Sequence, residues 1–198
     1  HAAAQADIGN LKQRAEGGDV NAQRQLAESY YLGKNTGQDY AEAARWYRVL
    51  AKHGDRRAQT SLGLMYANGW GVPRDLAEAR KLWSAAAAQG DPGAQYNLAI
   101  LYQEGRGVKR DAEQAFQWMK KAAQGGHIQG QHNLGLYYHD GFGVRQDGVQ
   151  AYAWVAIAAA QGDDKAREYL KILKRDLSAE QISEGEERVN EWLRKHLK

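Results

Sequence analysis

The sequence predicts an all-α fold, a right-handed α/α superhelix (solenoid) of about four 36-residue helix-turn-helix repeats with helical caps. Three observations predict it. A block of 36 residues recurs without an insertion, each block holds two apolar patterns with helical spacing, and the 198 residues include 22 glycines but only 2 prolines. Glycine rather than proline therefore marks the ends of the elements.

Seven positions carry the 36-residue period, because each holds the same residue type in four successive blocks. In the first block they are Leu26, Tyr30, Gly33, Asp39, Ala43, Ala51 and Gly54. We therefore expect an N-terminal capping helix over residues 1–18. Four repeats follow at 19–54, 55–90, 91–126 and 127–162, and a partial fifth repeat with a C-terminal capping helix occupies 163–198.

The first helix of a repeat is predicted to begin after an aspartate that follows a glycine and can accept bonds from free backbone N–H groups. These aspartates are Asp19, Asp55, Asp91 and Asp163. In the first repeat, Ala22, Leu26 and Tyr30 form an apolar stripe at i, i+4 and i+8. Gly33 and its copies are expected in the left-handed conformation that ends a helix. A Gly-x-Gly-Val turn follows in the later repeats, whereas the first repeat has Asn35-Thr36.

The second helix is predicted to begin with a capping box, in which the cap and a Glu or Gln three residues on exchange hydrogen bonds. The boxes are Asp39…Glu42, Asp75…Glu78, Asp111…Gln114 and Asp147…Gln150. Another box, Ser178…Gln181, marks the final helix, and residues 5–16 are expected to form the N-terminal cap. On the second helices we expect buried packing, rather than a sugar-stacking ladder, from Trp46, Trp83, Trp118 and Trp154.

The combined pattern resembles the Sel-one-like repeat (SLR) family, a branch of the tetratricopeptide-repeat superfamily, over roughly residues 15–170. In the second repeat it is carried by Ala58, Leu62, Gly63, Tyr66, Gly69, Gly71, Val72, Asp75 and Ala79. The fourth repeat departs from it at Gly130 and at Gly148-Val149. The resemblance implies a protein that holds other proteins on a concave surface, in a bacterial regulatory, envelope or secretion assembly.

Composition narrows the function classes. The 27 basic and 24 acidic residues leave a formal net charge of +3, too small to favour nucleic acid as a partner. The chain has no cysteine, which excludes a disulfide framework and a thiol nucleophile. Its longest apolar run, residues 151–160, is half of what a membrane span needs, so we expect no membrane insertion.

A possible export signal lies near the start of the chain. Ala4-Gln5-Ala6 before Asp7 has the A-x-A form of a signal-peptidase site. This pattern favours a periplasmic or exported protein, and a cytoplasmic location is the alternative.

The candidate partner-binding residues lie on the face of the first helices that helical geometry places opposite the core stripe, where residue type changes from repeat to repeat. Beside this face we add Arg57, Trp70 and Phe142, the last two because they lie in turns. The full predicted set is Arg24, Arg57, Thr60, Leu64, Trp70, Tyr96, Asn97, Ile100, Gln103, His132, Asn133, Leu136, His139 and Phe142.

The chemistry of this set suits a protein or peptide. Asn97 and Asn133 each offer a donor and an acceptor to an extended backbone, and Arg24 and Arg57 can meet a carboxylate. The alternative for the apolar members is packing against neighbouring helices; they are Leu64, Ile100 and Leu136.

Other functions have weaker support in the sequence. Three histidines invite a metal site, but their spacing favours ordinary surface residues; they are His127, His132 and His139. No nucleophile stands beside an orienting base, so we predict no catalytic residue, no cofactor and no metal. The prediction is a non-catalytic adaptor for a protein or peptide. Binding of an envelope glycan or peptidoglycan fragment is the alternative, and a hydrolase is the weakest candidate.

Overall fold

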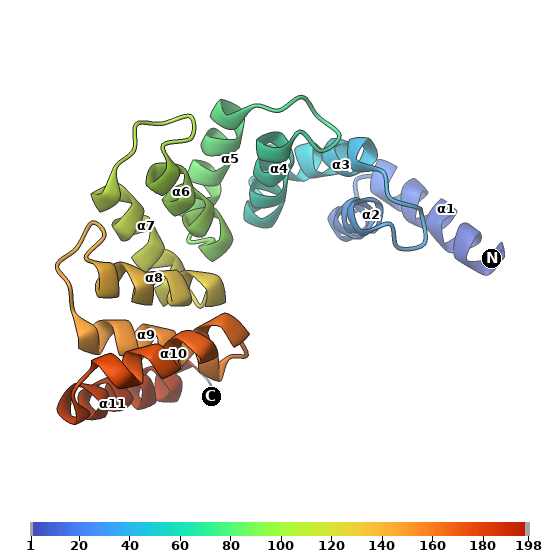
Figure 1. Cartoon of the computed structure of the whole chain (residues 1–198). Helices are drawn as coiled ribbons and strands as arrows, with labels where there is room; N and C mark the ends of the chain where they lie inside the picture. Colours follow the sequence, from blue (N-terminus) through green and yellow to red (C-terminus); the bar gives the residue numbers. More distant parts are fainter. Residues whose placement is uncertain (1, 197–198) are drawn as a thin grey trace. The chain divides into compact units, whose positions relative to one another are not determined.

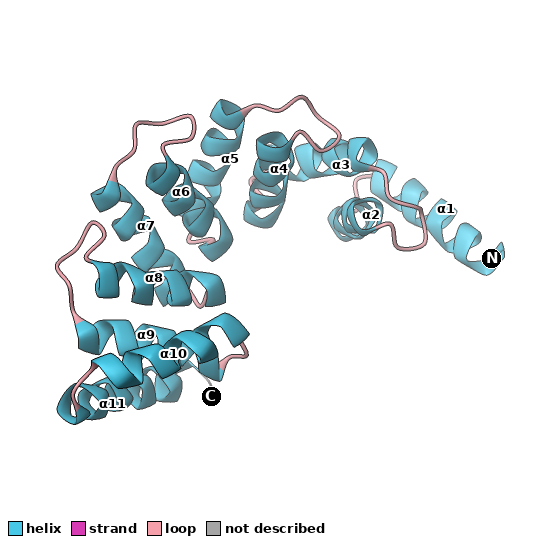
Figure 2. Ribbon diagram, viewed as in Figure 1, coloured by secondary structure: helices cyan, strands magenta, loops and turns pink. Residues whose placement is uncertain are grey.

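The computed structural model describes the backbone of residues 2–196 and the side chains of residues 8–196, so the Ala4-Gln5-Ala6 side chains lie outside the described residues. In that range the chain consists of eleven α-helices and no strands (Figures 1 and 2), which confirms the predicted all-α repeat fold. The helices are α1 (Ala2–Glu16), α2 (Val20–Leu32), α3 (Tyr40–Lys52), α4 (Arg56–Asn68), α5 (Leu76–Ala88), α6 (Pro92–Glu104), α7 (Ala112–Gln124), α8 (Ile128–Asp140), α9 (Gly148–Ala160), α10 (Asp164–Asp176) and α11 (Ala179–His196).

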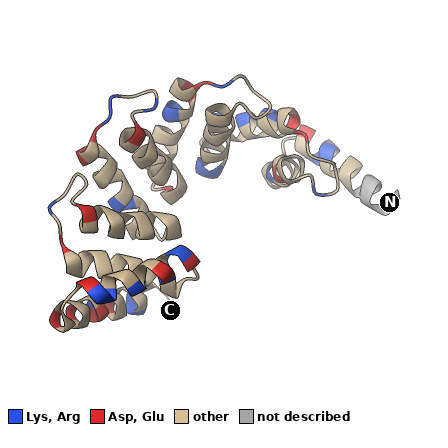
Figure 3. Cartoon of the chain, viewed as in Figure 1, with Lys and Arg blue, Asp and Glu red and all other residues tan. Residues whose placement is uncertain are grey.

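The helices form two compact units. Unit 1 (His1–Asp91) holds α1 to α5, and unit 2 (Pro92–Lys198) holds α6 to α11. In each repeat a first helix pairs with the second helix that follows it, as α2 with α3 and α8 with α9. Charged residues are concentrated on α10 and α11 in unit 2, whereas α9 carries none (Figure 3).

The period-36 leucines form the centre of the core, as predicted. Leu26 and Leu134 are 0% exposed, and Leu62 and Leu98 are at most 3% exposed. Of the tyrosines in the next column, Tyr30 is buried and its three copies are half-buried. Small residues let the paired helices approach closely: a Cβ on Gly135 would lie 2.5 Å from the Val155 side chain of the partner helix.

The predicted starts of the first helices are confirmed for three of the four aspartates, and the predicted glycine ends for Gly33 and Gly141. Asp19, Asp55 and Asp163 each accept a hydrogen bond from the backbone N–H three residues on. Gly33 and Gly141 end their helices in the left-handed conformation, both with φ of 73°. These caps satisfy N–H and C=O groups that a helix end otherwise leaves unpaired.

Of the two hydrogen bonds predicted for each capping box of the second helices, one forms and the other goes to a different acceptor. Asp39 accepts from the Glu42 N–H, as predicted, but its own N–H donates to the carbonyl of Tyr30 at 2.9 Å instead of to the Glu42 side chain. Asp75, Asp111 and Asp147 repeat this arrangement with the tyrosine of their own repeat. The last turns of the first helix thus supply the backbone acceptor. The Ser178…Gln181 box, where the Ser178 N–H donates to the Gln181 side chain, forms in both directions at 3.0 and 3.2 Å.

The second glycine of the Gly-x-Gly turn is required by close packing between repeats. Gly71 and Gly143 have φ of 66° and 68°. A Cβ on Gly71 would overlap the backbone carbonyl group of Tyr40, and one on Gly143 would overlap that of Ala112. Tyr40 and Ala112 are the first residues of the preceding second helices α3 and α7. Each turn therefore rests directly on the previous repeat.

The tryptophans divide into two kinds. Trp46 and Trp83 are 4% exposed, which confirms the core prediction for them. Trp118 and Trp154 are only half-buried, but both pack against the core cluster that contains Leu134, so they contribute to the core without being enclosed by it. The Lys121 ammonium lies 4.4 Å from the Trp118 ring centroid, and Trp154 lines an open cavity.

Candidate functional site

We call the surface formed by α2 and α4 in unit 1, and by α6, α8 and α10 in unit 2, the first-helix face of each unit. Most of the predicted binding residues belong to these helices. Contacts between successive repeats fix where these side chains lie, and the two kinds of contact described next are the most regular.

A column of buried glutamines joins each repeat to the helix before it. The column is Gln23, Gln59, Gln95 and Gln131, all at most 8% exposed. The Gln131 amide donates to the Ala123 carbonyl at 3.2 Å and accepts from Gln161 at 2.5 Å. The same bond joins Gln23 to Ala15, at 3.0 Å. Sequence reasoning missed this column, although its 36-residue spacing was a readable signal.

A second set of contacts involves the variable column that begins at Arg24. Arg24 Nη2 donates to Asp55 Oδ2 at 2.7 Å, and Thr60 Oγ1 donates to Asp91 Oδ1 at 2.9 Å. Asp55 caps the next repeat's first helix, and Asp91 holds the equivalent position one repeat later. The column therefore joins repeats as well as facing outward.

The residue type in this column follows the cap that it meets. In the fourth repeat His127 replaces the aspartate and accepts from the Gly130 N–H through Nδ1. There Tyr96 stacks on the His127 ring, with centroids 4.4 Å apart. The cap of the fifth repeat's first helix is again an aspartate, Asp163, and His132 Nδ1 lies 3.4 Å from its Oδ2 atom. Part of the variation that predicted partner recognition thus has a structural cause.

In unit 1 the two predicted arginines come together. Arg24 and Arg57 line one cavity of about 540 Å³ with Asp55, Arg56 and Gln89. Three guanidinium groups and one carboxylate leave an excess of two positive charges there. Arg24 is held by Asp55 and Arg56 by the Gln89 carbonyl at 3.0 Å, while the Arg57 side chain is exposed and has no hydrogen bond or ion pair to another described residue.

The carboxyl group of Asp55 responds to this setting. Burial raises its pKa, but the Arg24 guanidinium and the Ala58 backbone N–H outweigh burial and hold the pKa below its ordinary value. Asp55 is therefore ionised at neutral pH and holds the Arg24 guanidinium in the cavity lining by their ion pair. The cavity can accept a carboxylate or another anion between Arg24 and Arg57.

In unit 2 the first-helix face carries a more apolar cavity of about 530 Å³, lined by His132, Leu136, Asp164, Lys165, Glu168, Tyr169 and Ile172. His132 and Leu136 were predicted, and the α10 residues were missed. Glu168, Tyr169 and Ile172 continue the columns of His132, Asn133 and Leu136 by one more step of 36. Extending the variable columns into the fifth repeat would have found them.

Several other predicted residues of unit 2 take part in contacts, most of them between successive repeats. Asn133 Nδ2 donates to the Tyr96 hydroxyl at 3.4 Å, and the Gln103 side-chain oxygen accepts from the buried Tyr137 hydroxyl at 2.6 Å. His139 Nδ1 lies 2.8 Å from Asp140 Oδ1 and 3.0 Å from the Tyr169 hydroxyl. Three further predicted residues, one of them in unit 1, are half-buried; they are Leu64, Asn97 and Ile100.

The two aromatic residues predicted to mark an exposed edge are half-buried instead. Trp70 stacks on Tyr40 with ring centroids 5.5 Å apart. The ring centroids of Phe142 and Tyr137 are 4.9 Å apart. The Arg110 guanidinium lies over the Phe142 ring, 5.7 Å from its centroid. Trp70 therefore packs against Tyr40 of the preceding repeat, and Phe142 packs against Tyr137 of its own repeat.

Two searches of the described residues complete the survey. No group of three or more His, Cys, Asp or Glu side chains among them is arranged to hold a metal ion. None of the helices they form has both the length and the apolar character needed to cross a membrane.

Repeated hairpins joined by these contacts define an α-helical repeat protein of the solenoid class. The Sel1 repeat model matches residues 20–55, 56–91, 92–127 and 128–163, one residue later than the repeats expected from the sequence. The chain belongs to the Sel1 repeat family, as its sequence pattern indicated. Proteins of this family are generally protein-interaction scaffolds, and the fold is typical of non-catalytic ones.

Solved structures support the same assignment. A protective antigen present in uropathogenic Escherichia coli strains, displaying an SLR fold, is 33% identical with a TM-score of 0.87 over 96% of this chain. A Sel1 repeat protein from Oxalobacter formigenes is 31% identical with a TM-score of 0.67 over 77% of this chain. This chain spans 41% and 63% of the lengths of those two chains. No curated protein matches the sequence.

Proposed function

We propose that this chain is a non-catalytic adaptor that holds an acidic segment of a partner protein on the first-helix face of unit 1. The observation that carries the proposal is the cavity shared by Arg24, Arg56 and Arg57, which has two excess positive charges. The Arg57 side chain has no partner among the described residues, so its guanidinium is available for bidentate bonding to a carboxylate. The scaffold role of the family supports the same function.

The first-helix face of unit 2 supplies contacts of a different kind. Its cavity joins the apolar side chains of Leu136 and Ile172 to the Tyr169 ring, and Ile172 is 40% exposed. Such a surface can bury an aliphatic side chain of the partner. Asn97, half-buried on the same unit's first helix, can hydrogen bond to an extended backbone. The unit 2 surface thus suits an apolar side chain, whereas the unit 1 cavity suits an acidic one.

A crosslinking pulldown from cells that contain the chain tests the proposal. The charge-reversal variant Arg57→Glu is compared with Arg80→Glu, which changes an exposed arginine on α5, away from the cavity. We expect a partner captured by the wild type and by Arg80→Glu to be lost with Arg57→Glu. Equal capture by both variants would remove the arginine cavity from the binding surface.

We also propose that the chain acts outside the cytoplasm of a bacterium, in an envelope assembly. The A-x-A pattern at Ala4-Gln5-Ala6 and the bacterial origin of the two structural neighbours support this. Fractionation of cells that express the whole gene tests it: the protein is expected in the periplasmic or exported fraction, and recovery in the cytoplasmic fraction would contradict the proposal.

A further inference from the structure

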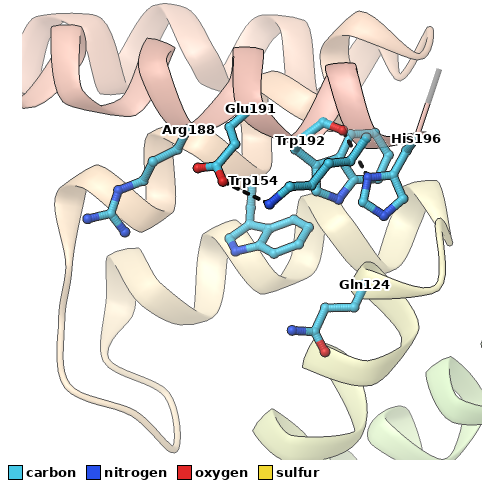
Figure 4. A pocket seen from close by; sticks show the side chains of 7 residues that line it. Gln124, Trp154, Arg188, Glu191, Trp192 and His196 are labelled. Carbon is cyan, nitrogen blue, oxygen red and sulfur yellow. Dashed lines mark hydrogen bonds and ion pairs between the residues drawn. The ribbon is translucent and has the colours of Figure 1, made fainter. Parts of the chain in front are cut away.

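A separate cavity lies in unit 2, on the side of the second helices. It has a volume of about 400 Å³ and is lined by Gln124, Trp154, Arg188, Glu191, Trp192, Lys195 and His196 (Figure 4). These residues come from α7, α9 and α11, and none belongs to the first-helix face. The proposed adaptor function makes no use of it.

Two indole rings supply the apolar surface of this cavity. Trp154 comes from α9 and Trp192 from α11, and both are half-buried. The His196 ring stacks on Trp192 with centroids 4.2 Å apart and an angle of 11° between the planes, so it covers one face of that indole and holds the ring in place. The equivalent position of the first repeat, Trp46, is 4% exposed and belongs to the core. The exposure of Trp154 is therefore a local feature of unit 2.

Polar side chains surround the rings and include both donors and acceptors. Figure 4 shows Arg188 and Glu191 reaching from α11 on one side of Trp154, with the Gln124 amide of α7 on the other. Lys195 donates to Glu191 at 2.8 Å, and Arg188 donates to Glu184 at 2.7 Å. In the lining, Arg188 and Lys195 face Glu191, which leaves one excess positive charge, and Glu184 outside the lining pairs with Arg188. The cavity is therefore less positive than the arginine cavity of unit 1 and is poorly suited to a phosphate or nucleotide.

A sugar ring matches this combination. Its C–H face packs on flat aromatic rings, and its hydroxyl groups need donors and acceptors placed around those rings. An aliphatic side chain of a peptide would contact the indoles but make no use of the exposed Gln124 amide and Glu191 carboxylate beside them. The volume is near the lower end of the range for small-molecule sites, which suits one or two sugar rings.

We propose that this cavity binds a saccharide, with Trp154 and Trp192 packing on its C–H face and Gln124, Arg188 and Glu191 bonding to its hydroxyl groups. The site goes beyond the adaptor function and is independent of the arginine cavity in unit 1.

Nuclear magnetic resonance of the indole N–H signals tests this site, because the chain has 6 tryptophans and each gives one signal. Trp154→Phe and Trp192→Phe assign the two relevant signals. The chain is titrated with chitotriose, cellotriose and sialyllactose, and with a tryptophan-containing peptide as the competing ligand class. We expect at least one saccharide to shift the Trp154 and Trp192 signals while those of the buried Trp46 and Trp83 stay in place.

Affinity variants provide the second readout. Trp192→Ala is expected to weaken saccharide binding about tenfold or more. Trp118→Ala, the matched half-buried tryptophan one repeat earlier on α7, is expected to leave it unchanged, and circular dichroism confirms that both variants are folded. The proposal is overturned if no saccharide shifts the two signals, if only the peptide does, or if folded Trp192→Ala binds as well as Trp118→Ala.

Discussion

Replacing Gly143 by alanine tests whether the Gly-x-Gly turns rest directly on the preceding repeat. Gly143 has φ of 68°, and a Cβ there would overlap the carbonyl of Ala112, the first residue of α7. The matched control is Gly126→Ala, because Gly126 has φ of 87° but nothing within 4 Å of the added Cβ. Both glycines belong to unit 2.

The expected magnitudes follow from these two geometries. Alanine in the left-handed region costs about 1–2 kcal/mol at either position. At Gly143 the overlap with backbone adds about 1–3 kcal/mol, the usual penalty for overpacking, because a helix backbone cannot move aside as a flexible side chain can. We therefore expect Gly143→Ala to lower the free energy of unfolding by about 2–5 kcal/mol, against about 1–2 kcal/mol for Gly126→Ala.

Urea unfolding followed by circular dichroism measures both variants on one scale, provided that the slope of free energy against urea is unchanged. A Gly143→Ala midpoint equal to that of Gly126→Ala would refute the packing argument. That result would mean that the turn has room for a Cβ and that the glycine serves only its backbone conformation.

Three further predictions concern the contacts between repeats and the core. Gln131→Ala removes the partner of two buried groups and is expected to destabilise by about 2–4 kcal/mol, against less than about 0.5 kcal/mol for the exposed Gln129→Ala, both measured by urea unfolding. Leu134→Ala, at a fully buried position, is expected to lower the unfolding free energy by about 2–5 kcal/mol, and a loss below about 1 kcal/mol would contradict its place in the core. Arg24→Ala is expected to destabilise by about 1 kcal/mol or less at neutral pH. The pKa of Asp55 is lowered in the folded chain, so this stability is present above the unfolded pKa of about 3.9 and is lost as the pH falls through the folded pKa; wild type and Arg24→Ala should converge in acid, and a constant difference would contradict the ion pair.

The sequence was sufficient for the repeat fold because each signal that specifies it is local. The Leu26 column, the Asp19 type of cap and the Gly33 type of helix end each depend on residues within one hairpin. The capping boxes were half wrong for the same reason. The N–H of Asp39 bonds to Tyr30, a partner nine residues away across the turn, and a pattern confined to the second helix does not show it.

The candidate site was harder to predict because it depends on how one repeat meets the next. Arg24 bonds to Asp55, 31 residues further along the chain, so the variable column has a structural role. Comparing equivalent positions of the repeats does not reveal this contact, because it joins two different columns. The sequence predicted that Arg24 and Arg57 can each meet a carboxylate, but not that they line the same cavity. Trp118 and Trp154 are half-buried whereas Trp46 and Trp83 are buried, a difference between equivalent positions that the residue type alone does not show.

The measurement that tests the central claim most directly follows the arginine Nε–H signals during titration with a hexaglutamate peptide at low salt. The arginine cavity of unit 1 predicts that the Arg24 and Arg57 signals shift together and return as salt is added, while that of Arg80 on α5 stays unchanged. Shifts spread evenly over the exposed arginines, or confined to Arg80 and its neighbours, would contradict recognition of an acidic partner at this cavity.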